Sequence, residues 1–194
     1  MAYPPEADFA GLIARLAEEL DRRRLPFMLI GGQAVLVHGE PRLTQDVDVT
    51  LGAAPERLDD VLAVCTALEL RPLPSDAEQF VRETFVLPAG DPVTGIRVDF
   101  LFSSTAYEAQ AIDRATRITV GGVAVPFATA EDLILHKLFA ARPRDLEDAA
   151  GIARRQGDAL DWSYITGWAR DFSQLEGRER MLDQAERLRH GLEP

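Results

Sequence analysis

The stretch that most constrains the fold is residues 28–51, MLIGGQAVLVHGEPRLTQDVDVTL. An apolar run meets Gly31 and Gly32, a short helical pattern follows, and after a turn the chain reaches an acid-x-acid strand with Asp46 and Asp48. Alternation in an extended strand directs both carboxylates to one face. Their Cα atoms are then about 6.6 Å apart, a spacing that suits carboxylates sharing Mg²⁺ ions. The stretch predicts a strand, a glycine turn for phosphate, a helix and a metal-binding strand.

Composition limits the partners that this chain can attract. Its 32 acidic and 21 basic residues give a formal charge of −11, so we expect no general attraction to DNA or RNA. Cys65 is the single cysteine and is expected in the core, which rules out an intramolecular disulfide. The N-terminus does not resemble a signal peptide, and no apolar run is long enough for a membrane span. We therefore expect a cytoplasmic protein without membrane binding.

Hydrophobic periodicity predicts an α/β portion followed by helices. Strands are expected at 27–30, 45–51, 79–87 and 95–102, with a small hairpin at 116–126. Helices are expected at 8–24, after the glycine pair, and at 55–69, 106–113, 130–141, 144–156, 161–172 and 175–190. The segment 71–78 is expected to be a loop, and 88–92 to connect the strands 79–87 and 95–102 as a hairpin. We expect two domains, 1–127 as the α/β core and 128–194 as a helical region packed on it.

A third carboxylate joins the acidic pair in the predicted sheet. In the strand 95–102, Arg97, Asp99 and Leu101 lie opposite the apolar face. Asp46, Asp48 and Asp99 would then be available for Mg²⁺, which prefers oxygen ligands, and Asp99 could also deprotonate an attacking hydroxyl. The alternative is that these acids only solvate an exposed face of the sheet. The glycine pair upstream and the third acid favour the metal site.

The residues around the acidic strand are candidates for phosphate binding. A strand that enters a helix through Gly31 and Gly32 lets backbone N–H groups approach a triphosphate, although such a pair can also be a mere turn. The pattern matches neither a dinucleotide-binding nor a P-loop motif. Gln33 could add a contact, and Arg42 and Thr44 precede the acidic strand. Arg42 could bind phosphate or pair with Glu40.

One lysine of the helical portion is a further candidate. Lys137 lies at the edge of an apolar stripe, and Arg142, Asp145 and Asp148 follow on neighbouring turns. Lys137 could bind nucleotide phosphate, or all four residues could form a structural ladder of ion pairs. The histidines share no metal-ligand spacing with one another or with the cysteine, so a zinc site is not expected.

These motifs together resemble a known superfamily. Gly31-Gly32, thirteen residues, Asp46-Val47-Asp48-Val49 and the later strand acid Asp99 resemble the nucleotidyltransferases related to DNA polymerase β. GGQAVLVHG, RLTQDVDV, ATAEDLILHKLFAAR and RDLEDAAGI are similar to AbiEii-type toxin nucleotidyltransferases and their small bacterial relatives. The resemblance covers about residues 27–155.

The resemblance implies a fold and an activity. It implies a nucleotidyltransferase fold of class α/β (α+β), a mixed sheet flanked by helices and followed by a C-terminal helical region. It also implies two Mg²⁺ ions on Asp46, Asp48 and Asp99, and an NTP bound by the glycine turn. Lys137, with Asp145 or Asp148, corresponds to the additional polar residues of the toxin-like members. The expected function is transfer of an NMP from an NTP to an acceptor hydroxyl (RNA, protein or small molecule), with release of pyrophosphate. An antitoxin partner would accompany a toxin role; the alternatives are an antibiotic adenylyltransferase or a non-catalytic nucleotide-binding module.

Overall fold

The computed structural model describes residues 8–194, which divide into two compact units. Among these residues, the first unit contains 8–33 and 44–127, and the second contains 34–43 and 128–194. The first unit holds every strand: β1 (Phe27–Ile30), β2 (Asp46–Gly52), β3 (Arg71–Pro72), β4 (Val86–Gly90), β5 (Arg97–Ser103), β6 (Thr116–Val120) and β7 (Val123–Phe127). The expected packing of the helical region on the α/β core stays a prediction.

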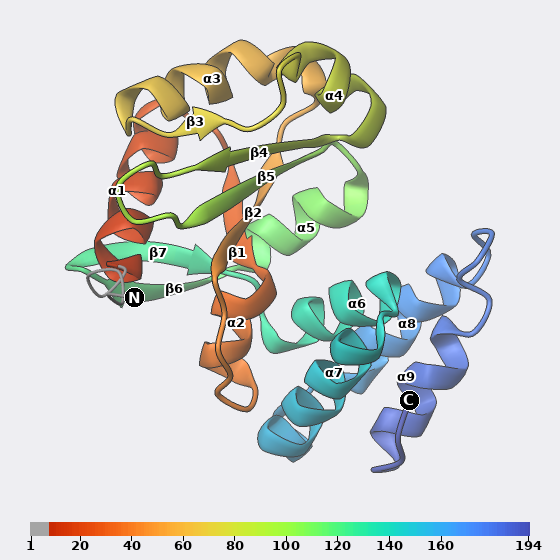
Figure 1. Ribbon diagram of the computed structural model, residues 1–194. Helices are drawn as coiled ribbons and strands as arrows, with labels where there is room; N and C mark the ends of the chain where they lie inside the picture. Colours follow the sequence, from red (N-terminus) through yellow and green to blue (C-terminus); the bar gives the residue numbers. More distant parts are fainter. Residues whose placement is uncertain (1–7) are drawn as a thin grey trace. The chain divides into compact units, whose positions relative to one another are not determined.

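One seven-stranded sheet organises the first unit (Figure 1). Its order is β3-β4-β5-β2-β1-β7-β6. β2 pairs with β5 and β1 with β7 in parallel, whereas the other neighbours are antiparallel. The expected mixed sheet of an α/β (α+β) fold is therefore confirmed, and the strand with the acidic pair lies at its centre.

Alternation along β2 separates the core from a polar face. Val47, Val49 and Leu51 are fully buried, whereas Asp46 and Asp48 on the opposite face are half-buried. β5 follows the same pattern, with buried Val98, Phe100 and Phe102 on one side. The sheet buries one apolar face of these two strands and leaves its acidic face partly open, as the alternating sequence predicts.

The helices of the first unit are α1 (Phe9–Arg22), α3 (Leu58–Ala67), α4 (Ala77–Thr84) and α5 (Ala106–Arg114), with a 3₁₀ turn η1 at Pro55–Arg57. α1 begins where the Asp8 carboxylate accepts a 2.8 Å hydrogen bond from Gly11 N, and its apolar stripe packs on α3 and β7. α5 contacts β2, where an added Cβ at Gly52 would meet Ile112 Cδ1 at 3.2 Å. Gly52 lies an even number of residues after Asp46 and Asp48 and therefore on the same face of β2. The helix α5 thus covers the acidic face at the Gly52 end of the strand.

The structure differs from the sequence-based expectation over residues 79–87. We expected a strand there, but residues 77–84 form α4 and only the end of the segment belongs to β4. Asp76 caps this helix, its carboxylate accepting a 2.9 Å hydrogen bond from Gln79 N. The aromatic residues that suggested a strand, Phe80 and Phe85, are 37% and 53% exposed. Residues 88–90, expected in the connector, pair with β5 instead, so the hairpin exists with a shifted first strand.

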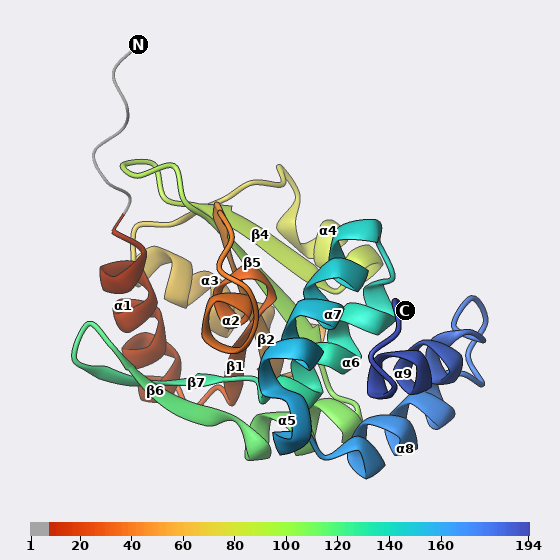
Figure 2. The same cartoon turned by 90° about the horizontal axis from the view of Figure 1, so that it is seen from below.

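The second unit is helical. Its helices are α6 (Ala130–Ala140), α7 (Pro143–Gln156), α8 (Trp162–Phe172) and α9 (Met181–Arg189), with a 3₁₀ turn η2 at Gly157–Ala159. They pack on one another in a bundle (Figure 2), and most of α2 (Gly31–His38) belongs to this unit. The first three of these helices confirm expectation, whereas α9 begins later than the predicted residue 175. Within residues 8–194, no helix combines the length and apolarity needed to cross a membrane.

Candidate functional site

Three carboxylates share the open face of the central strands. β2 and β5 run parallel with Asp48 in register with Asp99 and Asp46 in register with Arg97. Residues in register on neighbouring strands point to the same face, and neighbouring strands are about 4.8 Å apart. Asp46, Asp48 and Asp99 therefore lie on one face over two adjacent strands. The sheet brings together the three acids that the sequence singled out.

Gly31 lies directly against one of these carboxylates. It begins α2 with φ +61°, and a Cβ added there would be 1.7 Å from Asp48 Oδ2. Gly32 is also constrained, because its Cβ would be 2.2 Å from Thr44 Oγ1. The glycine pair thus lets the start of the helix lie against the acidic strand, with the Asp48 and Thr44 side chains filling the space that larger residues would need. Backbone N–H groups at a helix start have no intrahelical acceptor and carry positive partial charge, so the start of α2 favours an anion.

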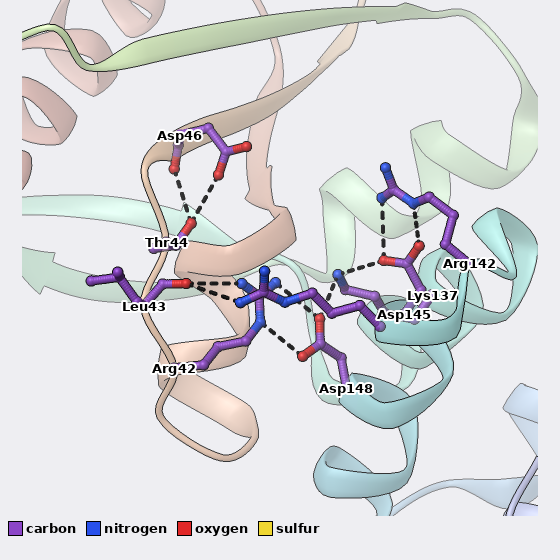
Figure 3. A network of polar contacts seen from close by, with 9 residues as sticks. Arg42, Leu43, Thr44, Asp46, Lys137, Arg142, Asp145 and Asp148 are labelled. Atoms are coloured by element: carbon purple, nitrogen blue, oxygen red, sulfur yellow. Dashed lines mark hydrogen bonds and ion pairs between the residues drawn. The ribbon is translucent and has the colours of Figure 1, made fainter.

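Two neighbouring side chains hold Asp46 in place. The Thr44 hydroxyl donates a 2.8 Å hydrogen bond to Asp46 Oδ1, as Figure 3 shows. The buried Gln33 side chain makes a long contact of 3.5 Å from Nε2 to the carbonyl oxygen of Asp46. We expected Gln33 and Thr44 to bind nucleotide; in the structure both contact the acidic strand, and their role toward nucleotide stays a prediction.

Arg97 is a member of this face to which the sequence analysis gave no role. Its Nε donates a 2.7 Å hydrogen bond to Asp99 Oδ1. That bond raises the pKa of Arg97, partial burial opposes the rise, and the charges of Asp99, Asp46 and Asp48 raise it further. The guanidinium therefore responds to all three carboxylates. Strand alternation already placed Arg97 beside Asp99, so the signal was present in the sequence.

The donor set of this face suits a divalent cation. Within residues 8–194, no group of three or more His, Cys, Asp or Glu side chains is gathered tightly enough to hold a metal ion as it stands. Nevertheless, Asp46 and Asp48 offer carboxylate oxygens, the ligands that Mg²⁺ prefers, from one face of β2 beside Asp99. Mg²⁺ usually completes its shell with water and substrate phosphate. The chemistry of these residues is therefore compatible with Mg²⁺, and its binding here stays a prediction.

The second unit contains a separate cluster of charges around Lys137. Its Nζ donates to Asp145 Oδ1 at 2.9 Å and pairs with Asp148 Oδ2 at 2.8 Å (Figure 3). Arg42 binds Asp148 through Nε at 2.8 Å and through a second nitrogen at 3.0 Å, and Arg142 pairs with Asp145. Lys137 and both aspartates are buried. We name these five residues the Lys137 cluster.

The ion pairs control the ionisation of the two buried acids. Burial works to raise the pKa of Asp145, but hydrogen bonds from Arg142 and Lys137 lower it overall. The same opposition acts on Asp148, where Arg42 and Lys137 lower the pKa. The expected ladder of Lys137, Arg142, Asp145 and Asp148 is thus present. Whether Lys137 also binds nucleotide stays a prediction.

Arg42 does not take the partner that the sequence suggested. Glu40 was the alternative partner, but Arg42 binds Asp148, and Glu40 pairs with Arg154 at 2.9 Å. α7 also anchors the same loop by hydrogen bonds from Arg155 to the Gly39 carbonyl and from Arg144 to the Leu43 carbonyl. These partners are about a hundred residues away along the chain, so no local pattern predicts them.

The fold and the family of this chain are those of nucleotidyltransferases. The sheet is mixed, its central strand β2 has two acids, and a third acid lies in register beside them. The glycine turn is at the start of α2, the helix that precedes β2. A protein-family comparison agrees: residues 8–180 match the family described as nucleotidyltransferase of unknown function, DUF6036, and the chain belongs to it. Its membership in the AbiEii-type group stays a prediction.

Solved structures support the same fold. The solution structure of the antibiotic-resistance factor ANT(2″)-Ia has a TM-score of 0.59 and 17% identity, covering 88% of this chain and 96% of that one. A crystal structure of ANT(2″)-Ia with adenylyl-2″-tobramycin has a TM-score of 0.55 and 20% sequence identity, and the match covers 77% of this chain and 90% of that one. An antigenic nucleotidyltransferase-like protein from Paracoccidioides brasiliensis has a TM-score of 0.54 and 14% sequence identity, and the match covers 100% of this chain and 97% of that one. No curated protein matches the sequence.

Proposed function

We propose that this chain transfers a nucleoside monophosphate from an NTP to an acceptor hydroxyl and releases pyrophosphate. One observation carries the proposal. Gly31 fits directly against the Asp48 carboxylate, which is in register with Asp99, so the start of α2 and the paired acids meet at the same point of the sheet. A glycine pair that served only as a turn would not need to lie against a carboxylate. An acidic face that was only solvated would not need the start of a helix beside it.

The chain's own groups would divide the binding of the triphosphate. Backbone N–H groups at the start of α2 would bind β- and γ-phosphate oxygens. Asp46 and Asp48, with Asp99, would hold two Mg²⁺ ions, which when bound neutralise phosphate charge and polarise the α-phosphate. The Thr44 hydroxyl would keep the Asp46 carboxylate oriented. Gln33 and Thr44, which belong to the same unit as the acidic face, remain our candidates for direct nucleotide contacts.

Asp99 is the proposed general base. The acceptor oxygen would attack the α-phosphorus, the bond from that phosphorus to the bridging oxygen of the β-phosphate would break, and pyrophosphate would leave. The proton of the hydroxyl would pass to the Asp99 carboxylate, whose other oxygen accepts the Arg97 hydrogen bond and so keeps the group oriented. The reaction is balanced, since one P–O bond forms as one breaks.

Binding can be tested before any acceptor is known. Thermal unfolding would be followed with each of the four NTPs, with and without Mg²⁺, for the wild type and for the double variant Asp46→Asn/Asp48→Asn. The control is Glu56→Gln/Asp59→Asn, which makes the same charge change on exposed residues of the first unit. A ligand at about 100 times its Kd adds about 2.7 kcal/mol of stability.

We expect a Mg²⁺-dependent shift with at least one NTP that the acidic-face variant loses and the control keeps. No shift with any NTP, or an equal shift in both variants, would contradict the proposed site. Transfer of label from an α-³²P-labelled NTP would then separate an enzyme from a non-catalytic binding module. The chemical identity of the labelled acceptor would separate a toxin acting on RNA or protein from an enzyme that adenylylates an antibiotic.

A further inference from the structure

A groove in the first unit adjoins the acidic face. It is about 480 Å³ in volume and lies between the segment after β3, the helix α4 and the hairpin strands β4 and β5. Its lining includes Leu73, Asp76, Phe80, Glu83, Pro88 and Arg97. Small-molecule sites generally have volumes of about 300–1,000 Å³. We name this hollow the α4 groove; it is large enough for a small molecule.

Two residues connect the α4 groove to the proposed chemistry. Pro88 lines the groove and pairs in register with Asp99 on the next strand. Arg97 also lines it and donates the 2.7 Å hydrogen bond to Asp99. The groove therefore opens beside the carboxylate that we propose as the base, which is where an acceptor hydroxyl has to arrive.

The charges of the groove favour a cation. Asp76 accepts the capping bond from Gln79 N, and Glu83 accepts a 2.9 Å hydrogen bond from Gln79 Nε2. Both acids are exposed, and among the ion pairs of residues 8–194 neither has a basic partner. Arg97 is the cation of the lining, and its charge already faces the acids of the sheet. An occupant therefore meets net negative charge.

The walls of the groove are also apolar. Leu73 is 56% exposed and Phe80 is 37% exposed, high values for large hydrophobic side chains. Such residues can pack against the apolar face of a ring, while the carboxylates bind ammonium groups. A nucleic acid would be repelled by these carboxylates and by the net charge of −11.

We propose that the α4 groove is the acceptor site and that the acceptor is a small hydroxylated cation. This inference rests on the proposed nucleotidyl transfer, because it places the acceptor beside Asp99. Glu83 and Asp76 would bind ammonium groups, Phe80 and Leu73 would pack on the carbon skeleton, and a hydroxyl would reach past Arg97 toward Asp99.

Calorimetric titration without nucleotide tests the groove separately from the transfer. The probes are tobramycin, which is cationic and hydroxylated, and sucrose, which is neutral and hydroxylated. The test variant is Glu83→Gln. Its matched control is Glu78→Gln, the same change on the same helix at a residue that pairs with Arg82 and lies outside the lining.

We expect wild type to bind tobramycin and not sucrose, with affinity that falls as salt rises. Glu83→Gln should weaken binding about fivefold, corresponding to about 1 kcal/mol, whereas Glu78→Gln should change it less than about twofold. Absence of tobramycin binding, or equal loss in both variants, would overturn the groove assignment. If NTP binding survives in that case, only the acceptor inference fails; if NTP binding fails while tobramycin binds through Glu83, the nucleotidyl transfer fails instead.

Discussion

The acidic face of the first unit and the Lys137 cluster of the second unit both gather aspartates, but they treat charge in opposite ways. In the Lys137 cluster, Asp145 and Asp148 are buried and each has two basic partners. On the acidic face, three carboxylates lie together half-open to solvent, with Arg97 bonded to Asp99 and a neutral hydroxyl bonded to Asp46. Matched buried charge holds elements together, whereas accumulated charge of one sign at an open face favours a cationic ligand.

Removal of the central cation should have the largest effect on stability. Lys137→Met keeps the aliphatic length but leaves two buried carboxylates without their shared ammonium group. We expect a loss of about 3 kcal/mol in the free energy of unfolding, measured by urea denaturation. Arg154→Met is the control, because its pair with Glu40 is exposed and should contribute less than about 1 kcal/mol. A loss no greater than that of the control would break the contrast.

Substitution of Gly31 should have the next largest effect on the free energy of unfolding. Gly31→Ala places a Cβ against Asp48 Oδ2 and also strains a backbone with φ +61°, so we expect a loss of about 2 kcal/mol. Gly95→Ala is the control, since Gly95 has φ +74° but nothing within 4 Å of its Cβ, and should cost about 1 kcal/mol. In the double variant Gly31→Ala/Asp48→Ala the added Cβ no longer meets a carboxylate, so the part of the stability loss that comes from this clash should be recovered. Purely additive losses in the double variant would contradict the close approach.

Acid should weaken the Lys137 cluster in a defined range of pH. Because the ion pairs hold the folded-state pKa values of Asp145 and Asp148 below the ordinary value of an aspartate, they stabilise the fold at pH values above that ordinary value. This stability is lost as pH falls from about 4 through the folded-state pKa values. We expect the difference in urea midpoint between wild type and Asp148→Asn to shrink across that range. A difference that stays constant down to pH 2.5 would argue against the ion pairs.

The smallest effect is expected on the acidic face. Asp46→Asn removes one of three clustered negative charges from a half-open position and keeps a hydrogen-bond acceptor for Thr44. The free energy of unfolding should change by less than about 0.5 kcal/mol in urea denaturation. A loss as large as that of Lys137→Met would mean that these acids serve the fold, which would remove the distinction between the two regions.

Sequence reasoning found the parts of the site that depend on local periodicity. Alternation placed Asp46 and Asp48 on one face of their strand and Asp99 opposite the apolar face of its own, because strand residues two apart point the same way. The register of β2 with β5 then brings Asp99 beside Asp48. Sequence reasoning failed at Phe80 and Phe85, where apolar residues suggested a strand but the Asp76 cap and exposed positions favoured α4. It also could not find the bond between Arg42 and Asp148, which spans 106 residues and depends on tertiary packing.

The contact between Gly31 and Asp48 also limits how the sequence can change over generations. The carboxylate occupies the space that any side chain at position 31 would need. A descendant could therefore acquire a larger residue there with little cost only after it had lost the acid, and the backbone would still have to leave its left-handed conformation. Loss of the acid should come first and enlargement second, so a descendant that keeps the acid should also keep the glycine.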